Sequence, residues 1–226
     1  MVRVVVTGAS GYLGQHLLAA LAKDGLVGSV VAVYGSMPDF VAPCDTRSLD
    51  LSDDGACASL AALEPDVVVH LAAMSSPAAC EQDVDRARAI NCPTPLLDAL
   101  PPDLPFIFLS TDQARRPRPS SLSWRHRVPA CVARPRQRLR HRAARNSHRP
   151  RAQVYDGQTD GAAAPYTESS AASPVNAYGR TKLNFEQALA ERRHAVVLRS
   201  SLILGPPTPE KCRKQSFLQV NSLRFI

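Results

Sequence analysis

The stretch VRVVVTGASGYLGQHLLAAL, residues 2–21, decides the fold class of this chain. Its first six residues form a short apolar, β-branched run, which is typical of a buried strand. Three glycines follow in the spacing G-x-x-G-x-x-G, and the leucines after them recur at helical spacing. Glycine lets a backbone turn sharply and approach a pyrophosphate, whose charge the N-terminus of the next helix stabilises. Glycines also serve in ordinary turns, but a strand before them and a helix after them favour a dinucleotide-binding site.

The rest of the chain alternates between strand-like and helix-like segments. Continuous apolar runs such as DVVVHLAA suit a parallel sheet that is covered on both faces. In the last predicted helix Ser173 is the expected cap and Pro174 suits the first turn, while Pro93 and Pro95 are expected to bend or end the helix before them. The pattern predicts an α/β fold, a Rossmann-like doubly wound parallel sheet with right-handed crossovers. The predicted strands are 2–7, 29–35, 66–73, 105–110 and 194–205, and the predicted helices are 15–25, 53–65, 81–91 and 173–193.

Composition argues against several classes of protein. The apolar runs fall well short of the roughly 20 residues that span a bilayer. Six scattered cysteines, with no Cys-x-x-Cys pair and no His/Cys cluster, predict reduced thiols and no metal site. Because the sequence starts directly with a strand and leaves no room for a targeting peptide, we expect a cytoplasmic protein.

The formal charge of +7 is misleading, because one segment supplies it. Residues 114–153 hold 13 arginines, no lysine and no acidic residue, whereas the other residues hold 14 basic and 20 acidic side chains, a net charge of −6. An acidic domain that carries one basic segment gives no general argument for a nucleic-acid partner.

A second motif, Tyr178 and Lys182, is typical of carbonyl chemistry. The two residues are spaced i and i+4, so they share one face of the predicted helix. A tyrosine is a poor proton donor and acceptor at neutral pH, and an adjacent ammonium lowers its pKa by favouring the phenolate. Such a pair can pass a proton to a carbonyl while a nicotinamide supplies hydride. An exposed pair without function has the same spacing, and the glycine turn near the N-terminus favours the catalytic interpretation.

The end of the second predicted strand bears on which nucleotide binds. An acidic residue usually stands there in NAD-binding sites and holds the ribose 2′-hydroxyl. Here Val33-Tyr34-Gly35-Ser36 is followed by no carboxylate before Asp39. This leaves room for a 2′-phosphate, with Ser36 as its donor and Arg47 as its counter-charge, although Arg47 is equally explained as a solvated surface residue. We therefore expect NADP, with NAD as the alternative.

With these motifs in place, the sequence resembles the extended short-chain dehydrogenase/reductase family, within the NAD-dependent epimerase/dehydratase superfamily. The resemblance covers 1–113 and 154 to about 219, and it is strongest to the dTDP-4-dehydrorhamnose reductase branch. Relatives of this branch include the regulatory β subunit of methionine adenosyltransferase. The matching stretches, in family order, are TGASGYLG (7–14), DL (50–51), HLAA (70–73), Asn91, LSTD (109–112), YGRTK (178–182) and LRSSLILGP (198–206).

The resemblance implies where a bound cofactor lies. It places the pyrophosphate on the glycine turn and the adenine beside Asp50 and Leu51, with Ala72 and Ala73 along the cofactor. The cofactor-binding residues implied in this way are Gly8, Ser10, Gly11, Tyr12, Leu13, Gly14, Ser36, Asp50, Leu51, Ala72, Ala73, Tyr178 and Lys182.

The resemblance also implies three catalytic residues. Thr111 would bind the substrate carbonyl, Tyr178 would act as acid and base, and Lys182 would lower the pKa of the tyrosine and hold the ribose. Asn91 matches a position that braces the sheet, so we assign it no catalytic role. His70 lies in an apolar strand, where a packed histidine is expected.

Three interpretations of function follow from the resemblance. The first is an NAD(P)-dependent reductase that acts on a carbonyl of a nucleotide-linked sugar, with Ser200 and Ser201 near the nicotinamide side. The second is a cofactor-binding regulatory subunit that partners a methionine adenosyltransferase; a homodimer is a further expectation. The third is a catalytically impaired variant of either protein.

The third interpretation arises from the basic segment. The branch reads approximately STD, any residue, V, F or Y, D or any residue, and then G, and removing 114–153 would join STDQ to VYDG in that register. Translated non-coding sequence explains this composition, and a nucleic-acid or acidic-partner arm is the competing explanation; its one aromatic residue, Trp124, gives that arm little support. We expect a dinucleotide-binding domain in two parts, 1–113 and 154–207, a disordered insertion at 114–153, and an incomplete substrate lobe at 208–226.

Overall fold

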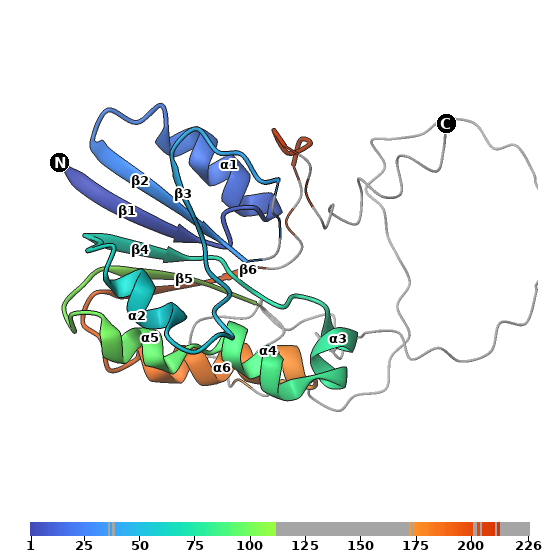
Figure 1. Ribbon diagram of the computed structural model, residues 1–226. Coiled ribbons are helices and arrows are strands. Elements are labelled where there is room, and N and C mark those ends of the chain that lie inside the picture. Colours follow the sequence, from blue (N-terminus) through green and yellow to red (C-terminus); the bar gives the residue numbers. More distant parts are fainter. Residues whose placement is uncertain are drawn as a thin grey trace, which may run out of the picture.

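A sheet with the strand order β3-β2-β1-β4-β5-β6 organises the structure, and every neighbouring pair in it is parallel (Figure 1). The computed structural model describes residues 1–35, 37, 39–111, 172, 174–200, 203, 205–210 and 212. The architecture confirms the predicted Rossmann-like doubly wound sheet. Within the described residues the strands are β1 (Val2–Thr7), β2 (Val27–Tyr34), β3 (Asp45–Ser48), β4 (Val67–His70), β5 (Phe106–Thr111) and β6 (Ala195–Ser200). The helices there are α1 (Tyr12–Leu21), α2 (Ala56–Ala61), α3 (Pro77–Gln82), α4 (Val84–Asn91), α5 (Thr94–Ala99) and α6 (Ala177–Leu189).

Helices cover both faces of the sheet, which explains the continuous apolar run in β1. Alternate residues of a strand face opposite sides. Val4 and Val6 pack with Leu18 of α1, whereas Val5 belongs to the core cluster that includes Leu60 of α2 and Phe185 of α6. Figure 1 shows α1 on one side of the sheet and α2, α5 and α6 on the other.

The strand order reverses between β1 and β4. From β1 the chain runs to β2 and β3 on one side, and it then returns to form β4, β5 and β6 on the other side. The carboxyl ends of the two central strands therefore lie together, with Thr7 opposite His70. Open parallel sheets bind ligands at this point, because the loops diverge there and leave a crevice.

The predicted cap of the helix that carries Tyr178 is wrong. α6 begins at Ala177, and the side chain of Asn176 caps it by accepting a hydrogen bond from the N–H of Gly179 at 2.7 Å. Pro174 precedes the helix instead of lying in its first turn. Asparagine is as good a cap as serine, and Asn176, which the prediction did not consider, takes this role.

Other boundaries also differ from the prediction. The predicted helix 81–91 is two helices, because Asp83 has a φ of −140° and its side chain caps α4 by accepting from the N–H of Arg86. Helix α5 was not predicted: Pro95 lies in its first turn, where a proline removes no helical hydrogen bond. Strand β3 was not predicted either, since its DTRS sequence is polar and mostly exposed.

Within the described part of the chain no helix is long and apolar enough to cross a membrane. The longest described helix, α6, has 13 residues, and about 20 are needed to span a bilayer.

Close packing at Gly14 generates a first prediction. A Cβ at this position in α1 would lie 2.6 Å from the carbonyl oxygen of Ala9 and would also overlap that of Gly8. Alanine normally stabilises a helix relative to glycine by about 1 kcal/mol, but here we expect Gly14→Ala to lower the free energy of unfolding by about 1–3 kcal/mol through overpacking. Thermal unfolding measures the difference. Gly25→Ala is the control, since a Cβ there meets nothing within 4 Å. A Gly14→Ala variant that melts at or above the parent would contradict this packing.

Candidate functional site

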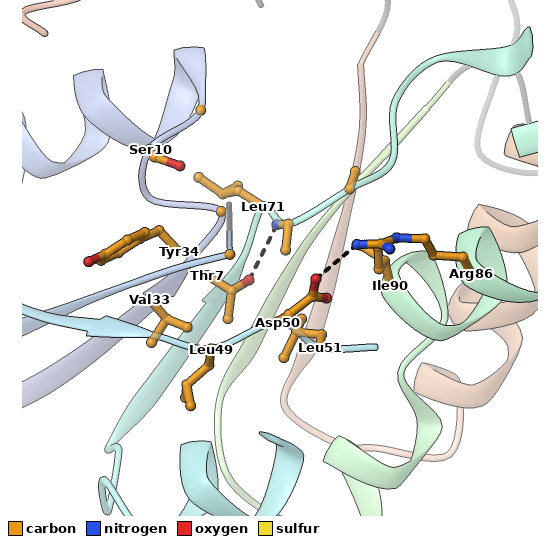
Figure 2. A pocket seen from close by; sticks show the side chains of 15 residues that line it. Thr7, Ser10, Val33, Tyr34, Leu49, Asp50, Leu51, Leu71, Arg86 and Ile90 are labelled. Carbon is orange, nitrogen blue, oxygen red and sulfur yellow. Dashed lines mark hydrogen bonds and ion pairs between the residues drawn. The ribbon is translucent and has the colours of Figure 1, made fainter. Parts of the chain in front are cut away.

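A pocket of about 220 Å³ lies at the carboxyl ends of the central strands (Figure 2). Its walls come from the β1–α1 turn, the end of β2, the segment after β3, the segment after β4, and α4. This is the position where the reversal of strand order predicts a ligand site. The sequence-predicted residues that line it are Gly8, Ser10, Gly11, Asp50, Leu51, Ala72 and Ala73.

The glycine turn forms the floor of this pocket. Gly8 has a φ of +67°, in the left-handed region that favours glycine, and a Cβ there would lie 2.6 Å from the backbone nitrogen of Ala72. Gly11 is the N-cap of α1 and donates its N–H to the carbonyl of Gly8 at 2.9 Å. No side chain caps α1 and its first turn contains no acidic residue, so its N-terminal N–H groups favour an anion.

The remaining predicted residues of the turn have other roles. Leu13 and Gly14 lie in α1 outside the pocket lining. The hydroxyl of Tyr12 donates to the carbonyl of Pro206 at 2.9 Å and so ties α1 to the segment after β6. Ser36 lies outside the described residues.

His70 is a packed core residue, as its apolar strand predicted. It is fully buried among Phe106, Phe108 and Phe185, and its Nδ1 is hydrogen-bonded to the hydroxyl of Thr7 at 2.8 Å. Burial, helped by the charge of Lys182, lowers the pKa of His70 to about 3. The ring is therefore neutral, and it links β1 to β4 next to the pocket.

Lys182 is buried in the adjoining region between α6 and β5. Its exposed fraction is 1%, its Nζ donates to the carbonyl of Leu109 at 3.0 Å, and the ammonium lies 4.5 Å from the centre of the Phe108 ring. Burial lowers the pKa of Lys182 to about 7, although nearby Cys80 and Glu186 oppose the shift. The amine is thus poised between its two protonation states near neutral pH.

Tyr178 and Thr111 lie on α6 and β5, the two elements between which this lysine is buried. Tyr178 is half-buried one turn before it and packs against a small cluster that includes Met74, Cys80 and Ala177. Thr111 is buried at the carboxyl end of β5, opposite Ser200 of β6 and two residues after the carbonyl that Lys182 contacts. Neither Thr111, Tyr178 nor Lys182 lines the pocket itself.

Side chains from α3 and α4 hold the first half of α6. Glu81 accepts the N–H of Ala177, the first residue of α6, at 2.6 Å. Asn91 donates to the hydroxyl of Thr181 at 3.0 Å and accepts the N–H of Met74 at 2.8 Å. Asn91 therefore braces α6 against the segment after β4.

The second half of α6 is held by a partly buried ion pair that the sequence did not reveal. The carboxylate of Glu186 accepts hydrogen bonds from the guanidinium of Arg199 on β6, whose Nε lies 2.9 and 3.0 Å from the two carboxylate oxygens. It also accepts a hydrogen bond from the hydroxyl of Ser110 on β5. Hydrogen bonding to Glu186 raises the pKa of Arg199. The helix that carries Tyr178 and Lys182 is thus fixed to both neighbouring strands.

A second ion pair lies in the pocket wall. The guanidinium of Arg86, on α4, contacts Asp50 at 2.9 Å, and Figure 2 shows the pair beside Leu51 and Ile90. Burial raises the pKa of Asp50, but hydrogen bonds from Ser52 and the charge of Arg86 outweigh it, so the pKa lies below its usual value. Neither Arg86 nor Ile90 was predicted, because the helix that carries them is far from Asp50 in sequence.

The expected counter-charge for a 2′-phosphate is exposed. Arg47, on β3, donates to the neighbouring carbonyl of Thr46 at 2.8 Å and does not line the pocket. The end of β2, at Tyr34 and Gly35, supplies no carboxylate to the pocket. Ser200 ends β6, and Ser201 lies outside the described residues.

A family model agrees with this geometry. The model of the NAD dependent epimerase/dehydratase family matches residues 4–119, and that of the RmlD substrate binding domain matches residues 150–220. The chain belongs to the NAD-dependent epimerase/dehydratase family. It is an extended short-chain dehydrogenase/reductase of the dTDP-4-dehydrorhamnose reductase branch, as the motifs predicted.

Two curated relatives match most of the chain. It is 29% identical over 206 residues to the probable low-salt glycan biosynthesis reductase Agl14 of Haloferax volcanii, which covers 88% of this chain and 53% of the relative. It is 26% identical over 209 residues to methionine adenosyltransferase 2 subunit beta of Danio rerio, which covers 90% of this chain and 48% of the relative. The chain thus spans about half the length of these relatives.

Solved structures share the fold. A hypothetical dTDP-4-dehydrorhamnose reductase from Sulfolobus tokodaii matches with a TM-score of 0.59 and 23% identity, covering 91% of this chain and 58% of that one. A dTDP-4-dehydrorhamnose reductase from Clostridium acetobutylicum matches with a TM-score of 0.61 and 20% identity, covering 98% of this chain and 59% of that one. UDP-glucose 4-epimerase from Brucella ovis in complex with NAD matches with a TM-score of 0.60 and 24% identity, covering 88% of this chain and 51% of that one.

The buried lysine generates a prediction about pH. Lys182 has a pKa of about 7 in the folded chain against an ordinary value of 10.5. Between these values the unfolded chain binds more protons, so this group makes stability rise with pH from about 7 to 10.5 and destabilises the fold below pH 7. We expect Lys182→Met to have a higher free energy of unfolding than the parent at pH 6. By pH 10 this difference between variant and parent should fall by at least about 1.4 kcal/mol, the equivalent of one pKa unit.

Denaturant unfolding at both pH values measures this difference. Lys23→Met is the matched control, because Lys23 is exposed after α1. A Lys182→Met advantage that is the same at both pH values would contradict a depressed lysine pKa.

Proposed function

We propose that this chain is an NADP-dependent reductase that acts on the carbonyl of a nucleotide-linked 4-ketosugar. The observation that carries the proposal is the buried Lys182, fixed on α6 one turn after Tyr178, beside a glycine-lined pocket where the strand order reverses. Similarity to a glycan biosynthesis reductase and the match to the RmlD substrate binding domain support the reaction class and the substrate class.

The pocket residues fit a dinucleotide. Gly8 and Gly11 leave the backbone open where any side chain would intrude, and the uncapped N-terminus of α1 would hold the pyrophosphate. The adenine would lie against Asp50 and Leu51. The absence of a carboxylate from the described end of β2 favours NADP, and several structural neighbours are described with NAD, which is the alternative.

A reduced nicotinamide supplies hydride to the carbonyl carbon when it is bound. Thr111, at the end of β5, would bind the carbonyl oxygen, and the phenol of Tyr178 would deliver a proton to it. Lys182 would stabilise the phenolate that remains, since a neighbouring ammonium favours the charged form of a tyrosine. The hydrogen bonds of Glu81, Asn91 and Glu186 would keep α6 in place during this transfer.

A second candidate is a cofactor-binding regulatory subunit. The match to methionine adenosyltransferase 2 subunit beta over 90% of this chain favours it. Co-purification of the chain with a methionine adenosyltransferase, without turnover of any ketosugar, would support this candidate over the reductase.

Residues 114–153 follow Thr111 closely and lie outside the described residues. We propose that this segment is an insertion that impairs catalysis, since it follows Thr111, which lies at the carboxyl end of β5 where a substrate would approach. The two family-model matches support an insertion, because the first ends at 119 and the second begins at 150.

Substitution of Tyr178 tests the reductase assignment. In a chain from which 114–153 has been removed and which has been extended to the full length of its relatives, we expect Tyr178→Phe to lower turnover of a nucleotide-linked 4-ketosugar by at least about 100-fold. NADPH affinity should stay within about twofold, because the phenyl ring keeps its packing, while Lys182→Met should damage both quantities. NADPH absorbance measures turnover and calorimetry measures affinity. Equal turnover by Tyr178→Phe and its parent would rule out the acid–base role.

A further inference from the structure

The pocket has a charged wall opposite its glycine turn. Among the described residues that line the pocket, Asp50 and Arg86 are the charged ones, and they contact each other at 2.9 Å. Leu51 and Ile90 line the pocket beside them (Figure 2). If the pyrophosphate binds at the glycine turn, as the proposed function requires, the adenine end of the dinucleotide lies against this wall.

The Asp50 carboxylate is held at three points. One oxygen accepts the N–H of Ser52 at 3.0 Å and its hydroxyl at 2.7 Å, and the other oxygen accepts from Arg86 at 2.9 Å. A carboxylate offers about four lone-pair positions. One position is therefore left for a donor on a ligand, and the three existing bonds fix its direction.

Arg86 is placed by the break between α3 and α4. The side chain of Asp83 accepts the backbone N–H of Arg86 at 3.0 Å, which starts a new helix at Val84. With this register Ala87 is buried against the core, while Arg86 and Ile90, one turn apart, reach the pocket. The exposed fraction of the Arg86 side chain is 50%, so water partly screens its charge.

Charge explains why Asp50 needs a partner. A dinucleotide carries at least two negative charges, and an isolated carboxylate in the same pocket would repel it. The guanidinium cancels that charge while leaving one oxygen position open. A carboxylate accepts a hydrogen bond from an amino group but has none to donate to a carbonyl oxygen.

We propose that Arg86 is the positioning residue for the base end of the cofactor: it holds Asp50 so that the carboxylate accepts the 6-amino group of adenine and rejects a base with a 6-oxo group. This rests on the proposed dinucleotide pocket and adds the residue that sets its base specificity. Arg86 acts through Asp50 and does not contact the phosphates.

Titrations of the full chain with NADH, NADPH and reduced nicotinamide hypoxanthine dinucleotide test the proposal. The parent should bind NADH about tenfold more tightly than the hypoxanthine analogue, since one hydrogen bond to a charged acceptor is at stake. Arg86→Ala should weaken NADH binding by about fivefold, as expected for a half-exposed ion pair, and reduce the preference for adenine to about twofold. Arg86→Lys should restore part of the preference. Arg88→Ala is the control, because it removes the same charge from an exposed position of α4 outside the pocket lining.

A double-mutant cycle with Asp50→Asn separates positioning from direct contact. If Arg86 acts through Asp50, Arg86→Ala should change NADH affinity by less than about twofold in the Asp50→Asn background. An unchanged adenine preference in Arg86→Ala would overturn the proposal. An equal loss of NADH affinity on Arg86→Ala in the parent and in Asp50→Asn would also overturn it. A loss of affinity for NADPH alone would overturn it too, because it would indicate that Arg86 contacts the 2′-phosphate. A folded parent that binds none of the three nucleotides would instead overturn the proposed function, and this inference with it.

Discussion

The close approach of the β1–α1 turn to the segment after β4 is the constraint on which the pocket depends. Gly8 adopts a φ of +67° within van der Waals reach of Ala72, and no side chain fits between them. The hydroxyl of Thr7 accepts the N–H of Ala72 at 3.3 Å and is hydrogen-bonded to the buried His70. These contacts fix the two central strands at the point where their order reverses, and the pocket opens there.

The second constraint is the cost of a buried ammonium. Lys182 loses its hydration between α6 and β5, and in return it donates one hydrogen bond to the carbonyl of Leu109 and lies over the ring of Phe108. Such a group is held only if its helix cannot move away. Glu81 of α3 and Asn91 of α4 supply that anchoring, together with Glu186 of α6 itself, which is bound by β5 and β6. Structural polar contacts therefore surround a group whose pKa is lowered to about 7.

Local patterns in the sequence were sufficient for the fold and for the motifs of the site. β1, the glycine turn and α1 are specified by residues within one short stretch, and β1 was predicted with its observed bounds. The Tyr178–Lys182 pair was placed correctly on one helix because its spacing is local. Where two local signals compete, as at Ser173 and Asn176 before α6, the sequence does not choose between them. Strand β3 was not predicted because its polar sequence lacks apolar alternation, and it is a strand through its parallel pairing with β2.

Contacts between distant residues could not be read from the sequence. The Asp50–Arg86 pair joins residues 36 positions apart, and the contact of Glu81 with α6 joins residues 96 apart. The split at Asp83 has the same origin: nothing in 81–91 except one aspartate indicates a break, yet that break turns Arg86 toward the pocket. The site therefore combines a glycine turn that the sequence predicts with side-chain contacts that only the folded chain brings together.

The central claim is that the glycine turn binds the pyrophosphate of a nicotinamide nucleotide, and calorimetric titration of the chain with NADP and NAD tests it most directly. Gly11→Asp is the decisive variant, because aspartate is a good N-cap and Gly11 has an extended backbone with φ −75°, so the fold is kept while a carboxylate takes the place of the phosphate. The account predicts binding by the parent and none by Gly11→Asp at unchanged melting temperature. A folded parent that binds neither nucleotide, or a Gly11→Asp variant that binds as tightly as the parent, would contradict it.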